Sequence, residues 1–150
     1  MKRWSSWLLA AALAVVPLWA APALAEEDAA KVIVHPDVAQ DDISRSLLRG
    51  IFGMRVRIWP DGQPVRVFVL EADHPLHAQF CRTQLRTYPY QLEQSWDRLV
   101  YSGTGQRPTR VPSIEAMRRE VATTPGAIGY VPDDSAPEAA AHAARILDVR

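Results

Sequence analysis

Apolar residues in this chain follow two alternating patterns: short continuous runs, and stripes at helical spacing. The runs are rich in β-branched and aliphatic side chains and are bounded by proline or glycine turns, which is typical of buried strands. Four strands are predicted on this basis, at residues 31–35, 65–70, 127–131 and 146–149. Pro36 ends the first of them, and the turn at Pro125-Gly126 leads into the third.

Between these strands, apolar residues spaced three or four positions apart predict four helices. The second helix begins at Pro75, with Asp73 or His74 as its N-cap. The third ends before the polar turn that starts at Ser102. The inward stripes of the other helices are Ile43, Leu47, Leu48 and Ile51 in the first, Leu92, Trp96, Leu99 and Val100 in the third, and Ile114, Met117 and Val121 in the fourth.

The ends of the first helix are predicted from charge and from glycine. Asp41 and Asp42 open it with negative charge at the positive end of the helix dipole, and Gly53 suits a left-handed stop. No repeat or internal linker interrupts the alternation of strands and helices. This order predicts a three-layer α/β domain with one core.

The first 25 residues have the layout of a secretory signal peptide. Lys2 and Arg3 form a positively charged start, an apolar stretch follows, and Ala23-Leu24-Ala25 is a small-x-small cleavage site. We therefore expect a bacterial, periplasmic protein whose mature domain spans residues 26–150, with no membrane span after cleavage. A retained membrane anchor is the alternative, but two prolines interrupt the run, which is shorter than the ~20 apolar residues of a spanning helix.

The charge of the mature chain excludes some partners. It keeps all 17 acidic residues and loses two of the 17 basic ones, which leaves a formal charge of −2. No basic stripe for nucleic acid and no polybasic face for anionic lipid is present in the sequence. We expect no nucleic-acid partner.

Cys81 is the only cysteine, so no disulfide can form within the chain. In an oxidising compartment an unpaired thiol is buried, reactive or paired with another molecule. Because Cys81 follows Phe80 in a predicted helix, a buried packing residue is the favoured interpretation.

The four histidines do not form a convincing metal site. They are His35, His74, His77 and His142. His74 and His77 can face one way on a helix, but no third ligand stands near them in sequence. Helix capping and surface exposure are therefore favoured over metal binding, and we expect no metal and no cofactor.

Catalytic chemistry has little support in the sequence. Glu71 and Asp73 form a pair of carboxylates of the kind that acid–base catalysis uses, but acids flanking a helix start usually cap it. No Ser–His–Asp or Cys–His arrangement follows from the spacing, so we expect no catalytic residues and no enzyme. The Arg118-Arg119 pair, with Arg82 and Arg86, is predicted on solvated helix faces, and Tyr88-Pro89-Tyr90 is predicted to pack over the helix of Trp96.

Three segments carry a resemblance to a known family. They are Ile51-Phe52-Gly53 with Trp59-Pro60-Asp61-Gly62; Ser95-Trp96 through Gly103-Thr104-Gly105, with Pro108; and Thr124-Pro125-Gly126-Ala127-Ile128-Gly129-Tyr130-Val131. In this order they resemble the phosphate-binding-protein-like group, which includes the periplasmic solute-binding components of phosphate ABC transporters. The last segment is the most specific.

The resemblance implies a periplasmic-binding-protein-like single lobe, with a mixed sheet flanked by helices. Proteins of this group have two lobes that close on a ligand, and the present chain is long enough for one. The implied function is non-enzymatic solute binding, of phosphate or another small oxyanion, in connection with ABC-type transport. The implied protein partner is a membrane transporter.

The family's anion loop is altered here. In the relatives, a strand delivers Arg and then Asp, and Ser-Gly-Thr follows at a helix N-terminus, where free N–H groups and the dipole hold an anion. With Phe80 as the anchor, the corresponding positions hold Leu70, Ala72, His74, Pro75 and Leu76. None keeps the family's side chain, and Pro75 has no N–H. Ser102-Gly103-Thr104 spells the lost tripeptide but lies where the family has a glycine turn.

Two functions therefore remain open. If an anion binds, the N-terminus of the helix that begins near Pro75 is the expected place, with Asp73, His74, Leu76 and His77 as ligand-binding residues. A protonated His74 adds a positive charge there. The alternative is an interaction or sensory module that docks on a membrane partner and binds no solute.

Overall fold

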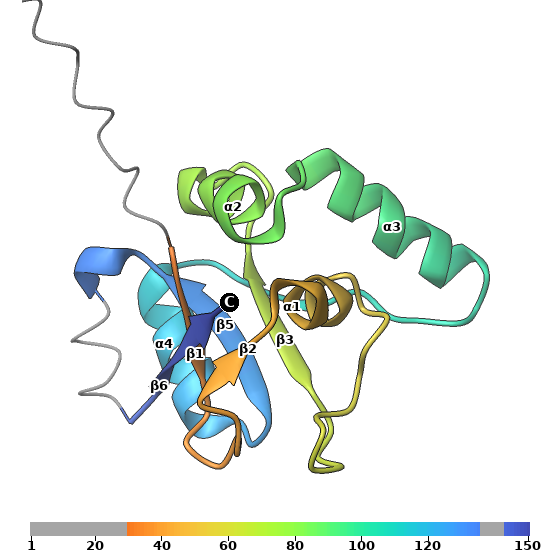
Figure 1. Ribbon diagram of the computed structural model, residues 1–150. Helices are drawn as coiled ribbons and strands as arrows, with labels where there is room; N and C mark the ends of the chain where they lie inside the picture. The colour runs from red at the N-terminus through yellow and green to blue at the C-terminus, as the bar shows by residue number, and fades with distance from the viewer. Residues whose placement is uncertain (1–29, 136–142) are drawn as a thin grey trace, which may run out of the picture.

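The computed structural model describes residues 30–135 and 143–150 (Figure 1). The expected signal peptide, its cleavage site and His142 lie outside these residues. The described strands form one six-stranded sheet in the order β2-β6-β1-β5-β3-β4. Their bounds are β1 Lys31–Val34, β2 Asp42–Ile43, β3 Arg66–Leu70, β4 Thr109–Val111, β5 Ala127–Val131 and β6 Arg145–Val149.

The sheet is mixed, as the resemblance implies. β1 runs antiparallel to both of its neighbours, β5 and β6. β3 is parallel to β5 and β4, and β2 is parallel to β6. The four predicted strands are all present, and the short edge strands β2 and β4 are additions to the prediction.

In residues 30–135 and 143–150, four α-helices connect and cover the strands. They are α1 Arg45–Phe52, α2 Pro75–Phe80, α3 Pro89–Tyr101 and α4 Ile114–Thr123. A π-helical segment, Cys81–Leu85, continues α2 directly, and a 3₁₀ turn follows β5 at Asp133–Ser135.

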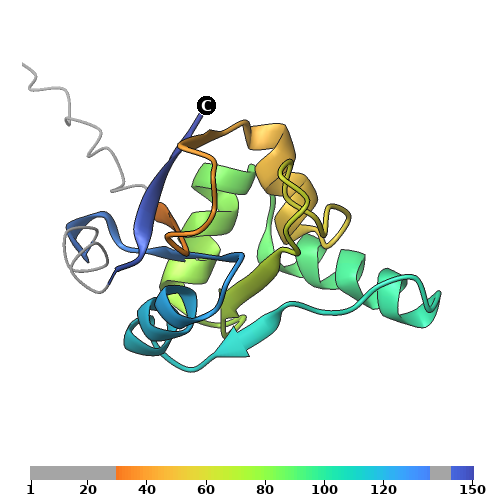
Figure 2. The ribbon, with the colours of Figure 1, turned by 90° about the horizontal axis from the view of Figure 1, so that it is seen from below.

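The helices lie on both faces of the sheet, which confirms the three-layer α/β prediction (Figures 1 and 2). Two successive residues of β5 show the layers, because side chains of a strand alternate between faces. A Cβ at Gly129 would lie 2.4 Å from Sδ of Met117, so this position faces α4. Tyr130 stacks on Phe80 of α2 with ring centroids 4.0 Å apart, so it faces the opposite layer.

The core is built around large side chains that come from the family-like segments. Trp59 and Trp96 are each 1% exposed. The indole N–H of Trp96 donates to the carbonyl of Phe52 at 2.8 Å, which ties α3 to the end of α1. The indole N–H of Trp59 donates to the carbonyl of Gly126 at 3.0 Å, which ties the turn before β3 to the turn before β5. These segments therefore hold the lobe together.

The predicted start of the first helix is wrong, and its predicted end at Gly53 is right in position but wrong in conformation. Asp42 belongs to β2, and α1 is capped instead by Ser44, whose hydroxyl accepts from the N–H of Leu47 at 3.2 Å. Asp42 and Asp41 pair with arginines of the C-terminal strand region, so their charges serve the sheet edge. At the other end, Gly53 has φ −76° and Met54 takes the left-handed conformation, with φ 59°.

Several predictions of which side chains are buried and which are exposed are also wrong. Tyr88 and Tyr90 are 55% and 59% exposed and stack on each other rather than covering Trp96. Tyr90 precedes Trp96 by six residues, which at ~100° per residue places it on another helix face. Val100 is 45% exposed because the end of α3 extends away from the sheet (Figure 1). Arg118 is 9% exposed because it follows Ile114 by one helical turn, beside the buried stripe of α4.

Candidate functional site

The four expected ligand-binding residues lie at the amino end of α2 but do not share one surface. Asp73 is exposed, and His74 is half-buried as the N-cap of the helix. Leu76 and His77 are buried, 6% and 1% exposed, and His77 faces the sheet. The predicted capping role of His74 is confirmed, and the predicted surface exposure of His77 is wrong.

The N–H groups of the first turn of α2 already have acceptors within the chain. Nδ1 of His74 accepts from the N–H of Leu76 at 3.1 Å. The carbonyl of His74 accepts from the N–H groups of His77 and Ala78 at 3.0 and 3.3 Å. Pro75 has no N–H. An anion at this helix end would therefore have to replace the imidazole of His74 as the acceptor.

His77 belongs to a buried hydrogen-bonded chain. The N–H of Leu70 donates to the hydroxyl oxygen of Tyr130 at 2.9 Å, and that hydroxyl lies 2.6 Å from Nδ1 of His77. Tyr130 and His77 share one proton across this contact, and the tautomer of His77 decides which of them donates it. Nε2 of His77 lies 3.7 Å from Sγ of Cys81. The chain satisfies every buried polar group in it.

Burial favours the uncharged forms of the three side chains in this hydrogen-bonded chain. Burial lowers the pKa of His77 to about 4 and raises the pKa of Cys81 to about 12. Burial also raises the pKa of Tyr130. Reactive cysteines need a lowered thiol pKa and access to solvent, and Cys81 has neither. The predicted buried packing role of Cys81 is confirmed, and the Cys81–His77 contact is structural.

No metal site is found in the part of the chain that the structure describes, where no three potential ligands gather. Nδ1 of His74 accepts the hydrogen bond of the helix cap. The two ring nitrogens of His77 contact Tyr130 and Cys81. Over the same residues, no helix is both long enough and apolar enough to cross a membrane.

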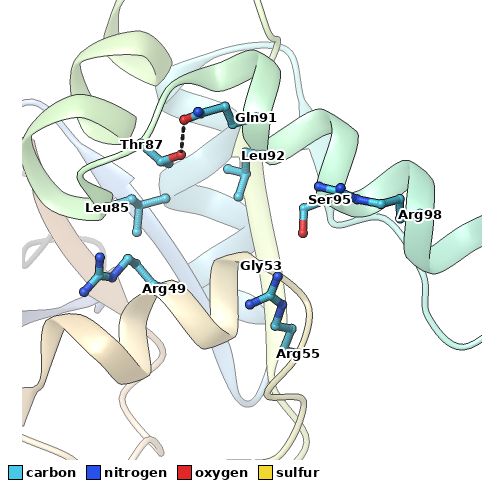
Figure 3. A pocket seen from close by; sticks show the side chains of 9 residues that line it. All are labelled: Arg49, Gly53, Arg55, Leu85, Thr87, Gln91, Leu92, Ser95 and Arg98. Atoms are coloured by element: carbon cyan, nitrogen blue, oxygen red, sulfur yellow. Dashed lines mark hydrogen bonds between the residues drawn. The ribbon is translucent and has the colours of Figure 1, made fainter.

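A second feature, which the sequence did not predict, is a pocket of about 210 Å³ between the end of α1 and α3 (Figure 3). It is lined by Arg49, Gly53, Arg55, Leu85, Thr87, Gln91, Leu92, Ser95 and Arg98. The lining contains three arginines and no carboxylate. Its residues come from three separate segments, so no local motif marks the pocket; the helical spacing of Gln91, Ser95 and Arg98 on α3 was the only sequence signal.

Solved structures with a similar fold include phosphate-transport binding proteins. The chain aligns with an ABC-type phosphate transport receptor from Vibrio cholerae (TM-score 0.55, 15% identity), covering 81% of this chain and 46% of that one. It aligns with PstS from Borrelia burgdorferi (TM-score 0.61, 15% identity), covering 82% and 47%. A structure from Clostridium perfringens that contains bound phosphate gives a TM-score of 0.62 at 12% identity, covering 81% and 45%.

These comparisons confirm the fold that the resemblance implies. The fold is a single α/β lobe like those of these phosphate-transport binding proteins, and the chain spans less than half the length of each of these structures. No protein-family model matches the sequence, and no match is found among curated proteins. At 12–15% identity the likeness shows the fold alone, and the ligand has to be argued from the site.

Proposed function

We propose that the protein is an exported, non-enzymatic binding protein of the bacterial periplasm that works in connection with ABC-type transport. The observation that carries this proposal is the fold, which aligns over 81–82% of the chain with substrate-binding proteins of phosphate transporters. The buried, uncharged state of the Cys81–His77 pair supports a role without catalysis.

The ligand we propose is a small oxyanion such as phosphate, bound at the amino end of α2 when His74 is protonated. A protonated imidazole has no lone pair, so it can no longer accept from the N–H of Leu76. Protonation therefore frees one backbone donor at the positive end of the helix and adds a positive charge beside it. The family's Arg is replaced by Leu70, so binding is expected to be weak with neutral His74.

Calorimetric titration of the mature chain with phosphate, sulfate and small carboxylates tests this proposal. At about pH 5.5, a saturable response to the tetrahedral oxyanions phosphate and sulfate is expected. A response to none of them at this pH would contradict oxyanion binding.

Export is tested separately by the mass of the protein recovered from the periplasm of a bacterial host. Cleavage after Ala25 should leave Glu26 as the first residue. An intact Met1 in the membrane fraction would instead support the retained anchor.

Docking on a membrane transporter or sensor, without a solute, is the second candidate. It is favoured by the first turn of α2, whose N–H groups are all satisfied in the structure with neutral His74. If the titrations show no anion binding while the chain co-purifies with a membrane protein after crosslinking, docking becomes the better account.

A further inference from the structure

The pocket between α1 and α3 has an unusual charge pattern. The guanidinium groups of Arg49, Arg55 and Arg98 make no hydrogen bond or ion pair with any residue among those the structure describes. Figure 3 shows Arg55 and Arg98 reaching toward Ser95, while Arg49 lies farther along α1. Three cations around one cavity without a counter-charge repel one another and favour an anion between them.

The acidic residues of α3 are directed elsewhere. Glu93 and Asp97 lie on a different face of the helix and pair with Arg107, and Glu93 also pairs with Arg110. Gln91, Ser95 and Arg98 share the face that lines the pocket, because they are spaced four and three residues apart. The helix thus presents its carboxylates to one set of arginines and leaves the pocket set unpaired.

The rest of the lining is mixed in character. Leu85 and Leu92 contribute apolar surface, and both side chains are nearly buried. Ser95 offers a hydroxyl that makes no hydrogen bond among the described residues, whereas the Thr87 hydroxyl is held by Gln91 at 2.9 Å. A ligand that suits this lining carries negative charge to pair with the arginines and apolar carbon atoms to contact the leucines.

We propose that this pocket binds a small organic polycarboxylate. Carboxylates match the planar fork of arginine bidentately, and more than one is needed to compensate three guanidinium groups. The cavity of about 210 Å³ is smaller than the roughly 300–1,000 Å³ typical of sites for drug-sized ligands, which limits the ligand to a small molecule. None of the lining residues belongs to the amino end of α2, so this site goes beyond the proposed oxyanion site and does not depend on it.

Citrate is the probe, and acetate and inorganic phosphate are the comparison ligands. Titrations of the mature chain are followed by backbone amide chemical shifts, with Ser95 and Leu92 reporting on the pocket and Leu76 reporting on α2. Citrate is expected to bind at least about tenfold more tightly than acetate or phosphate and to shift the pocket amides, since several charge-assisted bonds form at once.

The variant pair is Arg55→Gln with Arg98→Gln, which removes two of the three charges. It should weaken citrate binding by at least about tenfold, since two charge-assisted contacts are lost. Arg66→Gln is the matched control, because Arg66 is also exposed and unpaired among the described residues but does not line the pocket; it should change the affinity less than about twofold. The substituted residues Arg55, Arg98 and Arg66 are all exposed, so thermal unfolding should show that the variants are folded.

Three results would overturn the proposal. They are citrate binding that the double variant leaves unchanged, citrate and phosphate binding equally well at the pocket, and no citrate binding at all. If citrate shifts no amide signal while a glutamate-rich peptide shifts the pocket amides, the site recognises an acidic protein segment instead. If the pocket does not bind citrate, the amides of α2 can still respond to sulfate. The pocket proposal and the oxyanion proposal can therefore fail independently.

Discussion

The hydroxyl of Tyr130 lies 2.6 Å from Nδ1 of His77, and this buried contact joins the central strand β5 to α2. Tyr130 also accepts from the N–H of Leu70 in β3 and stacks on Phe80. One side chain of the most specific family-like segment therefore fixes the helix that carries the candidate anion site. This segment therefore holds the candidate anion site in place. The side chains expected to bind the ligand belong to a different part of the chain.

Acid should destabilise the protein through His77. Burial lowers the pKa of His77 from 6.5 to about 4 in the folded protein, so the unfolded chain binds more protons between these values. The contribution of His77 is fully present above about pH 6.5 and is lost as the pH falls toward about 4, with a loss of up to about 3 kcal/mol in the free energy of unfolding. Urea unfolding at several pH values measures it.

The variant His77→Gln removes the titrating group and should flatten the dependence of unfolding free energy on pH across this window. The variant will also be less stable at neutral pH, because the hydrogen bond between residue 77 and Tyr130 changes. The slope, and not the absolute stability, is the diagnostic quantity. An unchanged slope in His77→Gln would show that other groups cause the acid sensitivity.

Trp96→Ala should lower the free energy of unfolding by about 3–5 kcal/mol, the usual range for a large buried aromatic. Trp96 is 1% exposed, and its indole N–H donates to the carbonyl of Phe52. Tyr101→Ala on the same helix is the control; Tyr101 is 91% exposed, so its loss should cost less than about 0.5 kcal/mol. A cost below about 1 kcal/mol for Trp96→Ala would contradict the described packing of α3.

Gly126→Ala should destabilise the protein more than Gly62→Ala does. Both glycines have positive φ, 72° and 92°, so both substitutions carry a backbone penalty. A Cβ at Gly126 would also lie 2.2 Å from the carbonyl oxygen of Pro64, whereas nothing lies within 4 Å of one at Gly62. Thermal unfolding of the two variants compares them directly, and equal losses would mean that the turn before β5 can move aside.

Cys81 should resist thiol reagents in the folded protein. Its side chain is fully buried, and burial raises its pKa to about 12, so almost no thiolate is present at neutral pH. Modification with a chromogenic disulfide reagent should therefore be no faster than the opening of the structure around Cys81 and should become fast in denaturant. Rapid modification without denaturant would place the thiol in an accessible environment.

The sequence predicted most elements because their signals are local. The apolar run 127–131 matches β5 residue for residue, and the stripe through Met117 and Val121 matches the buried face of α4. Asp42 was misassigned because a strand of two residues has no periodicity, and its existence depends on pairing with β6.

The candidate sites were less accessible to sequence reasoning than the fold. The family-like motifs contain Trp59, Trp96 and Tyr130, which make hydrogen bonds inside the lobe. They consequently predict the scaffold and carry little information on the ligand. The pocket between α1 and α3 depends on which arginines find a carboxylate in three dimensions, and chain order does not reveal that pairing.

The central claim, oxyanion binding at the amino end of α2, is tested most directly by titrating the mature chain with sulfate at about pH 7.5 and about pH 5.5 while following the amide signals of Leu76 and His77. Sulfate keeps its charge over this range, so a change in affinity reports on the protein. Binding should tighten at the lower pH and shift the Leu76 amide, because protonated His74 releases that N–H and adds a charge. His74→Ala should abolish the pH dependence. Strong binding that is independent of pH and of His74→Ala, or no sulfate binding at either pH, would contradict the claim.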